Sequence, residues 1–239
     1  VNLVRMFGVI EDPQLGPALV MELCPRSLRS VLDDHQRAIS WTLRLRWLAE
    51  IARGMEFLHS LLPNNILHRD LKAANVLFSS EDLNVAVAKI ADFGLAVTVC
   101  TIQSTSSMAA SSGAAGTLAF KAPETFDGKF TKGSDVYAYA VLIFEMATRR
   151  VPFAGLSIPE INKRVLKRFE YDEDLYQEDG IDEEKQRARW HRRNPLEARR
   201  PDLALAEQDC PSALINLSVK CCADEVTTRP RLPDISALL

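Results

Sequence analysis

The sequence predicts an α+β fold that is mainly helical and has two short strands near its start. Residues 1–10 and 18–23 are short apolar segments separated by the turn sequence EDPQLG, a pattern typical of paired strands. Residues 41–60 and 135–148 are longer apolar segments with the length or spacing of helices. The chain has 239 residues, of which 47% are hydrophobic and 26% charged, enough for one sizeable core or two lobes.

The clearest helix follows a shorter helical segment at residues 28–35. Within residues 41–60, apolar side chains recur at steps of three or four and therefore share one helix face. These side chains are Leu43, Trp47, Ile51, Met55 and Leu58. Ser40 precedes the segment and can cap its first turn. Residues 66–92 then carry short strand signals interrupted by turns.

A second long helix is predicted in the later half of the chain. Ser134 can cap a helix over residues 135–148, which is apolar on nearly all sides. Such a helix is usually buried, so we expect it in the middle of a helical lobe. Residues 158–168 and 212–222 are expected to form further helices.

Charge and cysteine content narrow the class of protein. The net charge of −3 offers no electrostatic basis for binding nucleic acid. Five cysteines without a CxxC pair are typical of reduced thiols in an intracellular, cytoplasmic protein. The longest apolar run, residues 136–144, is too short to span a bilayer, and we find no signal peptide. The whole protein could still be attached to a membrane.

Two segments do not have the pattern of packed structure. Residues 97–117 are rich in Ser, Thr, Ala and Gly, which predicts a mobile loop. Residues 170–184 contain nine acidic and no basic side chains, whereas residues 185–200 contain seven Lys or Arg and one acid. This charged insertion near 170–200 is either a solvated segment whose halves attract each other or a docking segment for a partner.

Three short motifs occur in a characteristic order. HRDLKAAN covers residues 68–75, DFG covers 92–94, and APE covers 122–124 at the end of the predicted loop. Asp92 follows Asp70 by 22 residues (92 − 70). Together they resemble the catalytic loop, metal-binding tripeptide and activation-segment anchor of eukaryotic protein kinases. The resemblance extends over nearly the whole chain apart from 170–200. DLKAAN and DVYAYAVLIFEM are most similar to the tyrosine-kinase-like group of Ser/Thr kinases.

The resemblance implies a protein-kinase-like fold, ATP as phosphate donor and Mg²⁺ as the metal, with Mn²⁺ as an alternative. Asp70 would accept the proton of the substrate hydroxyl, because an ionised carboxylate can only accept. Asn75 and Asp92 would hold the metal through oxygen ligands. Lys72 would lie near the transferred phosphate. Lys72 and Thr117 together resemble the pair that Ser/Thr kinases have and tyrosine kinases usually lack.

The segment after the second strand resembles the nucleotide hinge of this family. Backbone groups of Glu22 and Cys24 would bind adenine, and Met21 would be the gatekeeper residue behind it. Apolar residues at a strand end are otherwise plain core. Glu124 resembles a glutamate that forms a buried structural pair, here with Arg229. We expect nothing of His35 and His59 beyond packing.

Arg69 admits a structural and a regulatory interpretation. It can brace the catalytic loop, or it can bind a phosphate that an upstream kinase places on the 97–117 loop. The candidate acceptors are Thr98, Thr101, Ser104, Thr105, Ser106, Ser107, Ser111 and Ser112. A Ser-rich loop that is merely flexible is the other interpretation.

The resemblance identifies residues 1–239 as a partial kinase domain. Residues 1–24 would form two strands and the hinge of the smaller lobe, and residues 25–239 would form the larger lobe. Neither a GxGxxG loop nor a VAIK-type strand precedes Val1. We therefore expect a longer parent chain, and expect residues 1–239 alone to bind Mg-ATP weakly without measurable activity. A pseudokinase or scaffold is the alternative to a protein Ser/Thr kinase. The catalytic loop and Asp92 favour the enzyme, and a small-molecule kinase fits less well.

Overall fold

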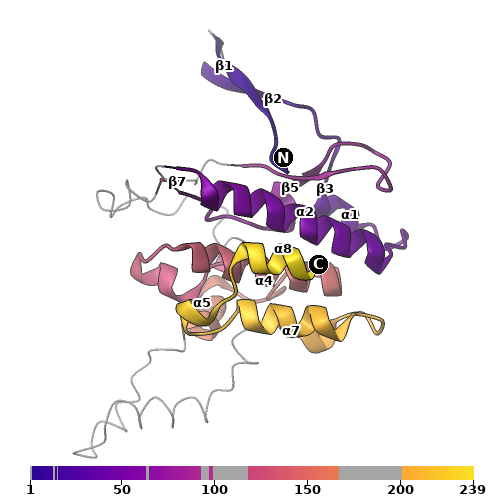
Figure 1. Ribbon diagram of the computed structural model, residues 1–239, viewed down its shortest axis with the longest axis vertical. Helices are drawn as coiled ribbons and strands as arrows, with labels where there is room; N and C mark the ends of the chain where they lie inside the picture. The colour runs from indigo at the N-terminus through magenta and orange to yellow at the C-terminus, as the bar shows by residue number, and fades with distance from the viewer. Residues whose placement is uncertain are drawn as a thin grey trace, which may run out of the picture.

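The computed structural model shows a helical body with a strand hairpin at one end. The described residues are 2–12, 14, 16–62, 65–92, 97–98, 118–166 and 201–239. Figure 1 shows the hairpin above a small sheet, with helices below it. Strands and helices occur together and the helices are longer, so the predicted α+β class is confirmed.

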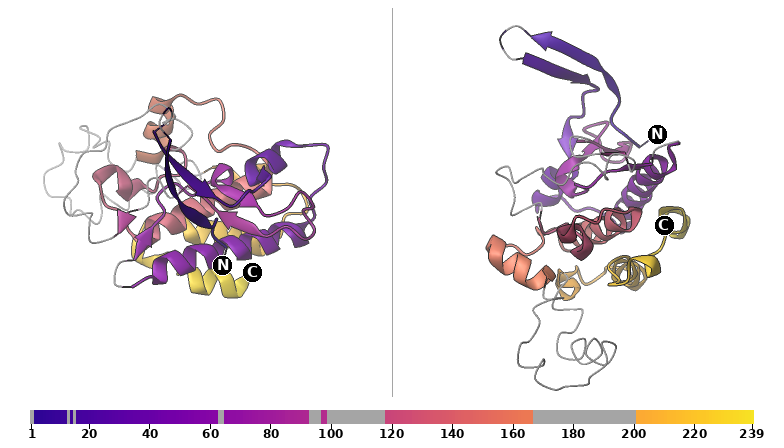
Figure 2. Two further views of the ribbon diagram at one scale, coloured as in Figure 1. Left: turned by 90° about the horizontal axis from the view of Figure 1, so that it is seen from above. Right: turned by 90° about the vertical axis from the view of Figure 1, so that its left-hand side faces the viewer.

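The hairpin consists of β1 (Met6–Asp12) and β2 (Gly16–Met21), which pair antiparallel as predicted. The first strand begins later than expected, because the residues before it join another strand. Leu3 forms a parallel bridge with Ile90, and Val4 N donates to Ile90 O at 2.8 Å. Most hairpin side chains are exposed, and Figure 2 shows the hairpin projecting from the body.

Short strands lie beneath the hairpin. A three-stranded antiparallel sheet has the order β3 (Arg26–Ser27), β5 (Val76–Phe78), β6 (Ala88–Ile90). A separate pair consists of β4 (Ile66–Leu67) and β7 (Val97–Thr98). The predicted short strands within 66–92 are thus confirmed.

Two predicted segments fall mostly outside the described residues. The loop prediction for 97–117 is wrong for its first two residues, because their backbone pairs with β4 as strand β7. Thr117 and the other residues of that loop lie outside the described part, and so does the charged insertion near 170–200.

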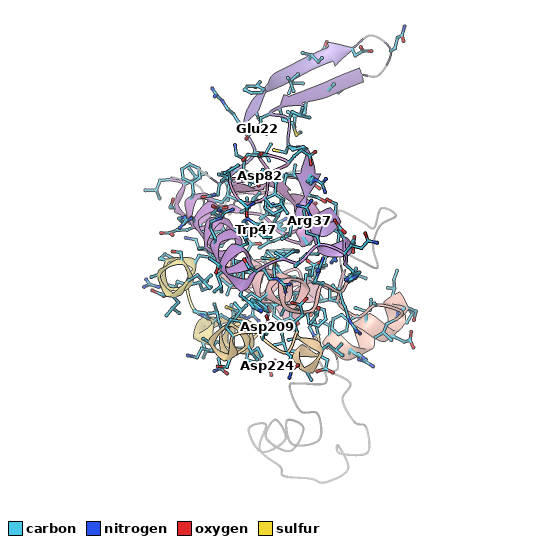
Figure 3. The ribbon with its side chains drawn as sticks, turned by 90° about the vertical axis from the view of Figure 1, so that its right-hand side faces the viewer. Glu22, Arg37, Trp47, Asp82, Asp209 and Asp224 are labelled. Atoms are coloured by element: carbon cyan, nitrogen blue, oxygen red, sulfur yellow. The ribbon has the colours of Figure 1, made fainter. Side chains whose placement is uncertain are left out.

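The early helices match their sequence signals. The shorter is α1 (Leu28–Asp33), whose N-cap is Ser27. The longer is α2 (Trp41–Ser60), and Ser40 Oγ accepts the amide of Leu43 at 3.3 Å, as predicted from the capping pattern. The apolar face of α2 is buried, and Trp47 lies in the middle of the body (Figure 3).

The buried helix in the later half is α4 (Lys132–Thr148), and every residue from Ser134 to Thr148 is buried, as expected for the centre of a lobe. The predicted cap is wrong. Thr131 is the N-cap, and Ser134 completes a capping box by accepting the Thr131 amide. Both residue types favour the cap position, so the sequence pattern alone did not separate them.

Further helices follow α4 along the chain. They are α5 (Ile158–Leu166), α7 (Ser212–Cys221) and α8 (Leu232–Leu238). Of these, α7 packs against α4 while α8 packs against α2 (Figure 1). The helices α5 and α7 agree with predicted helices, and α8 was not predicted. Its first turn contains a proline, and it has only seven residues, too few to show a clear period.

Gly54 in the middle of α2 allows the start of the chain to approach this helix closely. A Cβ atom at this position would lie 2.6 Å from the backbone oxygen of Asn2 and 2.8 Å from Ile90 Cδ1. Asn2 O also accepts the amide of Ile90 at 3.0 Å. The glycine therefore sets how near the segment before the hairpin can lie to both α2 and β6.

We predict that Gly54→Ala destabilises the protein even though alanine favours helix by about 1 kcal/mol. The backbone of Asn2 must move, and overpacking of this kind typically costs about 1–3 kcal/mol. Thermal unfolding of Gly54→Ala should show a lower Tm, while Arg53→Ala at the neighbouring exposed position should not. A higher Tm for Gly54→Ala would contradict the close approach.

Candidate active site

A buried carboxylate on α4 holds the start of the HRDLKAAN segment. Asp135 Oδ1 accepts the Arg69 amide at 2.9 Å, and Asp135 Oδ2 accepts the His68 amide at 2.9 Å. His59 Nε2 lies 2.8 Å from Asp135 Oδ2. The expectation that His59 has no role beyond packing is therefore wrong, because its partner is 76 residues away and no local pattern reveals the contact.

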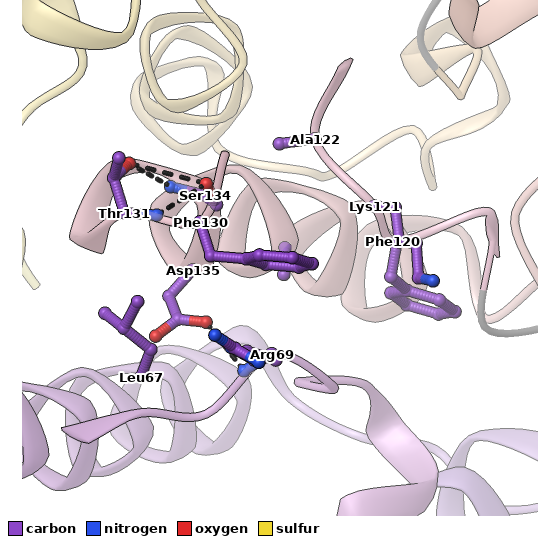
Figure 4. A pocket seen from close by; sticks show the side chains of 10 residues that line it. Leu67, Arg69, Phe120, Lys121, Ala122, Phe130, Thr131, Ser134 and Asp135 are labelled. Carbon is purple, nitrogen blue, oxygen red and sulfur yellow. Dashed lines mark hydrogen bonds between the residues drawn. The ribbon is translucent and has the colours of Figure 1, made fainter. Parts of the chain in front are cut away.

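Arg69 lies between α4 and residues 120–122. Its backbone has φ of 67°, its guanidinium lies over the Phe130 ring at 4.2 Å, and its buried Nε has no hydrogen-bond partner. Burial lowers the pKa of Arg69, and Asp135 opposes this effect. Figure 4 shows the small pocket that Arg69 lines together with Phe120 and Lys121.

The Asp70 carboxylate is fixed through one of its two oxygens. Lys72 Nζ donates to Oδ2 at 2.6 Å, and Asn75 Nδ2 donates to the same oxygen at 2.9 Å. Asn75 Nδ2 also donates to the Asp70 carbonyl at 2.8 Å. The other oxygen, Oδ1, is buried without a hydrogen-bond partner. An unpartnered buried acceptor is costly, so this oxygen is suited to receive a donor from outside the chain.

The backbone of Ala91, the residue before Asp92, is hydrogen-bonded to Asn75 and His68. The Ala91 amide donates to Asn75 O at 2.8 Å, and the Ala91 carbonyl accepts from the His68 ring at 3.0 Å. Asp92 is exposed and has φ of 61°, a backbone conformation that is uncommon outside glycine. Asp92 therefore directly follows Ala91, which contacts both ends of residues 68–75, the segment that we call the catalytic segment.

The side-chain oxygens of Asn75 and Asp92 are suitable ligands for a magnesium ion. Because Nδ2 of Asn75 donates to Asp70, the amide oxygen of Asn75 remains for a cation, and the Asp92 carboxylate is a second oxygen ligand of the type that Mg²⁺ prefers. No cluster of three or more His, Cys, Asp or Glu suited to a metal occurs in the described ranges. Two oxygen ligands agree with Mg²⁺, which usually keeps several waters and takes its other ligands from phosphates.

The predicted hinge is tied to the small sheet through Glu22. Its carboxylate accepts from Lys89 Nζ at 2.6 Å and from the Arg5 amide at 2.7 Å. The hydrogen bond from Lys89 is the main cause that lowers the pKa of Glu22. Burial raises the pKa of the Cys24 thiol, which disfavours the reactive thiolate. Figure 3 places Glu22 at the base of the hairpin.

The structure therefore assembles some predicted site residues and not others. Asp70, Lys72 and Asn75 are in direct contact, and Ala91 links Asp92 to them. The hinge is connected to β6 by the Glu22–Lys89 pair. Met21 ends β2 with a half-exposed side chain, and Thr117 lies outside the described residues.

The predicted Glu124–Arg229 pair is present and buried. Arg229 Nη1 and Nη2 donate to the two carboxylate oxygens at 2.6 and 3.0 Å, and Ser134 Oγ donates at 2.9 Å. Burial opposes ionisation of Glu124, but the hydrogen bonds and charge of Arg229 outweigh it and lower the pKa. The pair connects the segment before α4 to the segment before α8, as expected for a structural contact.

Comparison with known proteins agrees with this geometry. The family model of the protein tyrosine and serine/threonine kinases matches residues 1–239, so this chain belongs to that family. Kinases of this family generally use ATP and Mg²⁺. None of the helices in the described ranges has the length and apolar character needed to cross a membrane.

The individual relatives are named as protein kinases, and two of the three below as serine/threonine-protein kinases. The chain is 40% identical over 158 residues to receptor-interacting serine/threonine-protein kinase 3 of Rattus norvegicus, covering 62% of this chain and 31% of that protein. It is 37% identical over 163 residues to human mitogen-activated protein kinase kinase kinase 11, covering 65% and 18%. A probable serine/threonine-protein kinase of Dictyostelium discoideum is 32% identical over 235 residues, covering 98% and 45%. The chain thus spans less than half the length of these relatives.

We predict that Glu124→Gln destabilises the fold by about 3–5 kcal/mol at neutral pH, because it leaves the buried Arg229 without its ionic partner. The folded-state pKa of Glu124 is lowered, so the stability from its ionisation is present above the unfolded pKa near 4.5 and is lost as pH falls through the folded value. Urea unfolding should therefore show the difference between wild type and Glu124→Gln shrinking below about pH 4.5.

The exposed Glu225→Gln serves as the control for this measurement, with little effect expected at any pH. A Glu124→Gln protein as stable as wild type at pH 7 would show that the pair contributes no net stability.

Proposed function

We propose that this chain belongs to a protein serine/threonine kinase that transfers the γ-phosphate of Mg-ATP to Ser or Thr hydroxyls of protein substrates. The proposal rests above all on Asp70, whose Oδ2 is held by two donors while its buried Oδ1 has none. A carboxylate held in this way has a fixed direction and one open acceptor. A substrate hydroxyl would donate its hydrogen bond to this oxygen.

The proposed step moves one proton and one phosphoryl group. The substrate hydroxyl gives its proton to Asp70 Oδ1, and its oxygen forms a bond to the γ-phosphorus. The bond from that phosphorus to the β–γ bridging oxygen breaks, and ADP leaves with the electron pair. Lys72 lies 2.6 Å from Asp70 Oδ2, so its ammonium lies close to the charge that develops on the moving group.

Asn75 and Asp92 are the proposed metal ligands, and Mn²⁺ is compatible with the same oxygens. The bound ion would neutralise phosphate charge and orient the phosphates. For adenine we propose the backbone of Glu22 and Cys24, with Met21 as gatekeeper. The Glu22–Lys89 pair supports this proposal, because it fixes the hinge against β6, which leads into Asp92.

The choice of Ser and Thr over Tyr rests on Lys72. Its ammonium bonds to the catalytic carboxylate, as the resemblance to Ser/Thr kinases implies, and we propose Thr117 as its second partner. Two of the relatives are named serine/threonine-protein kinases, which agrees with this choice. The tyrosine-kinase-like group of Ser/Thr kinases remains the proposed place of this chain within the family.

We propose an intracellular signalling enzyme whose partners are a protein substrate and an upstream kinase acting on the 97–117 loop. The unpartnered Nε of Arg69 and the neighbouring Lys121 would receive the added phosphate. Within the chain, residues 1–24 would serve as strands and hinge of the smaller lobe and residues 25–239 as the larger lobe. Neither nucleic acid nor a membrane is part of the proposal.

A pseudokinase or scaffold is the second candidate function. It would need the fold but not the open acceptor of Asp70, nor the arrangement of Lys72 and Asn75 around it. These residues therefore favour the enzyme. A natural full-length protein that binds nucleotide without transferring phosphate would favour the scaffold.

We predict that Asp70→Asn in the natural full-length protein lowers turnover by roughly 10²- to 10⁴-fold, because the general base is lost. Affinity for Mg-ATP should hardly change, since Asp70 acts on the hydroxyl. Asp92→Asn should lower both turnover and Mg-ATP affinity. Steady-state kinetics and nucleotide titration measure the two effects, with the exposed Asp209→Asn as control (Figure 3). Equal loss of affinity in both site variants would mean that the roles are wrongly assigned.

We further predict that the reaction products carry phosphoserine or phosphothreonine. The reason is the Lys72 contact with Asp70, which resembles the contact in Ser/Thr kinases that tyrosine kinases usually lack. Phosphoamino-acid analysis after transfer from labelled ATP to a generic protein substrate provides the measurement. Mainly phosphotyrosine among the products would overturn the prediction.

A further inference from the structure

A second buried carboxylate of α4 holds the other end of the catalytic segment. Glu145 Oε2 accepts the Ala73 amide at 2.8 Å, and only 2% of the Glu145 side chain is exposed. Ala73 begins the short 3-10 helix that ends at Asn75. Neither Glu145 nor its partners belong to the residues that the proposed function uses.

Glu145 in turn is paired with Arg29 of α1. Arg29 Nη1 donates to Glu145 Oε1 at 3.0 Å, and Nη2 donates to the Arg149 carbonyl at 3.0 Å. Arg29 also pairs with Asp33 one turn later at 2.9 Å. Its side chain is 16% exposed, so the guanidinium is held mostly out of water. The position of α1 is thereby linked to the Ala73 amide through one carboxylate.

The two carboxylates are spaced to hold the segment at both ends. Asp135 and Glu145 are ten positions apart on α4 (145 − 135), which is about 15 Å along the helix axis. Their backbone partners Arg69 and Ala73 are four positions apart, and four extended residues span at most about 14 Å. The segment between them contains Asp70 and is anchored to α4 at both ends, so release of the Ala73 end would let Asp70 move.

We propose that Arg29 and Glu145 are positioning residues, which hold the catalytic segment through the Ala73 amide so that Asp70 is aligned for phosphoryl transfer. The inference deepens the proposed function and rests on it. It adds α1, an element outside the site, as a determinant of the rate of the chemical step. Neither side chain touches the substrate or the phosphates.

Protonation of Glu145 provides a readout of this connection. Burial raises the pKa of Glu145 to about 7, while the Ala73 amide and Arg29 act in the opposite direction and Asp33 raises it slightly further. These are the groups of the described residues that face Glu145 from the catalytic segment and from α1. The ionised form is the stronger acceptor for Ala73, so the rate should rise as pH increases through 7. Loss of Arg29 should move this rise to higher pH.

The test uses Arg29→Met in the natural full-length protein, since methionine keeps much of the stem and removes the charge. We expect kcat at pH 7 to fall by about tenfold, because a small displacement of Asp70 has a large effect on transfer. KM for ATP should stay within about twofold of wild type, since the nucleotide ligands are not displaced. The rise of kcat with pH should shift upward in Arg29→Met. Arg29→Lys should recover part of the rate, because it restores the charge beside Glu145 without the second bond to Arg149.

Hydrogen exchange of the peptide that contains Ala73 tests the contact without any need for catalysis. This amide should exchange faster in Arg29→Met than in wild type. Arg231→Met is the control, because Arg231 is exposed and pairs only with the exposed Asp234 among its ionic contacts in the described ranges. It should change neither the rate nor the exchange.

The outcomes separate the two proposals. An unchanged kcat, pH profile and Ala73 exchange in Arg29→Met would overturn the positioning role. Faster exchange in a protein whose wild type transfers no phosphate would support the contact and overturn the proposed function. Lower kcat together with faster exchange and a shifted pH profile would support both.

Discussion

The geometry of the site depends first on the buried carboxylate of Asp135. Taking a carboxylate out of water costs several kcal/mol unless hydrogen bonds satisfy it. The two backbone amides of the catalytic segment and the His59 ring supply these hydrogen bonds. The stability of α4 and the conformation of the segment are therefore coupled, because each satisfies polar groups of the other. The left-handed backbone of Arg69 persists under this constraint.

The helix that carries Asp135 has polar contacts along its whole length although it is buried. Thr131 and Ser134 close its first turn, and the Tyr139 hydroxyl donates to Leu48 O of α2 at 2.9 Å. At its end, Arg149 donates to backbone carbonyls at the end of α1, including that of Leu32. These carbonyls would otherwise lack partners at the helix terminus. The polar contacts thus fix how the neighbouring elements lie around α4, whereas apolar packing alone would allow them to slide.

Local sequence patterns predicted what depends on neighbours along the chain, and the family resemblance predicted one distant contact, the Glu124–Arg229 pair. Other distant contacts were missed. The helix starting after Ser40 and the short strands were predictable, because period and capping act within a few residues. The motif around Asp70 was recognisable by its spacing. The contact of His59 with Asp135 and that of Arg29 with Glu145 join residues 76 and 116 apart. No local pattern encodes such a pairing, and a buried Glu in an apolar helix gives no hint of its partner.

Three carboxylates around one segment illustrate how hydrogen bonding distinguishes a structural role from a chemical one. Asp135 and Glu145 both use their two oxygens on donors from other elements, which leaves them suited to hold backbone rather than to react. Asp70 is held equally firmly, but through Oδ2 alone. Its Oδ1 is buried without a hydrogen-bond partner, so the free energy lost by burying it is recovered only when a donor binds. Asp70 thus keeps one carboxylate oxygen available as an acceptor, whereas Asp135 and Glu145 use both of theirs within the chain.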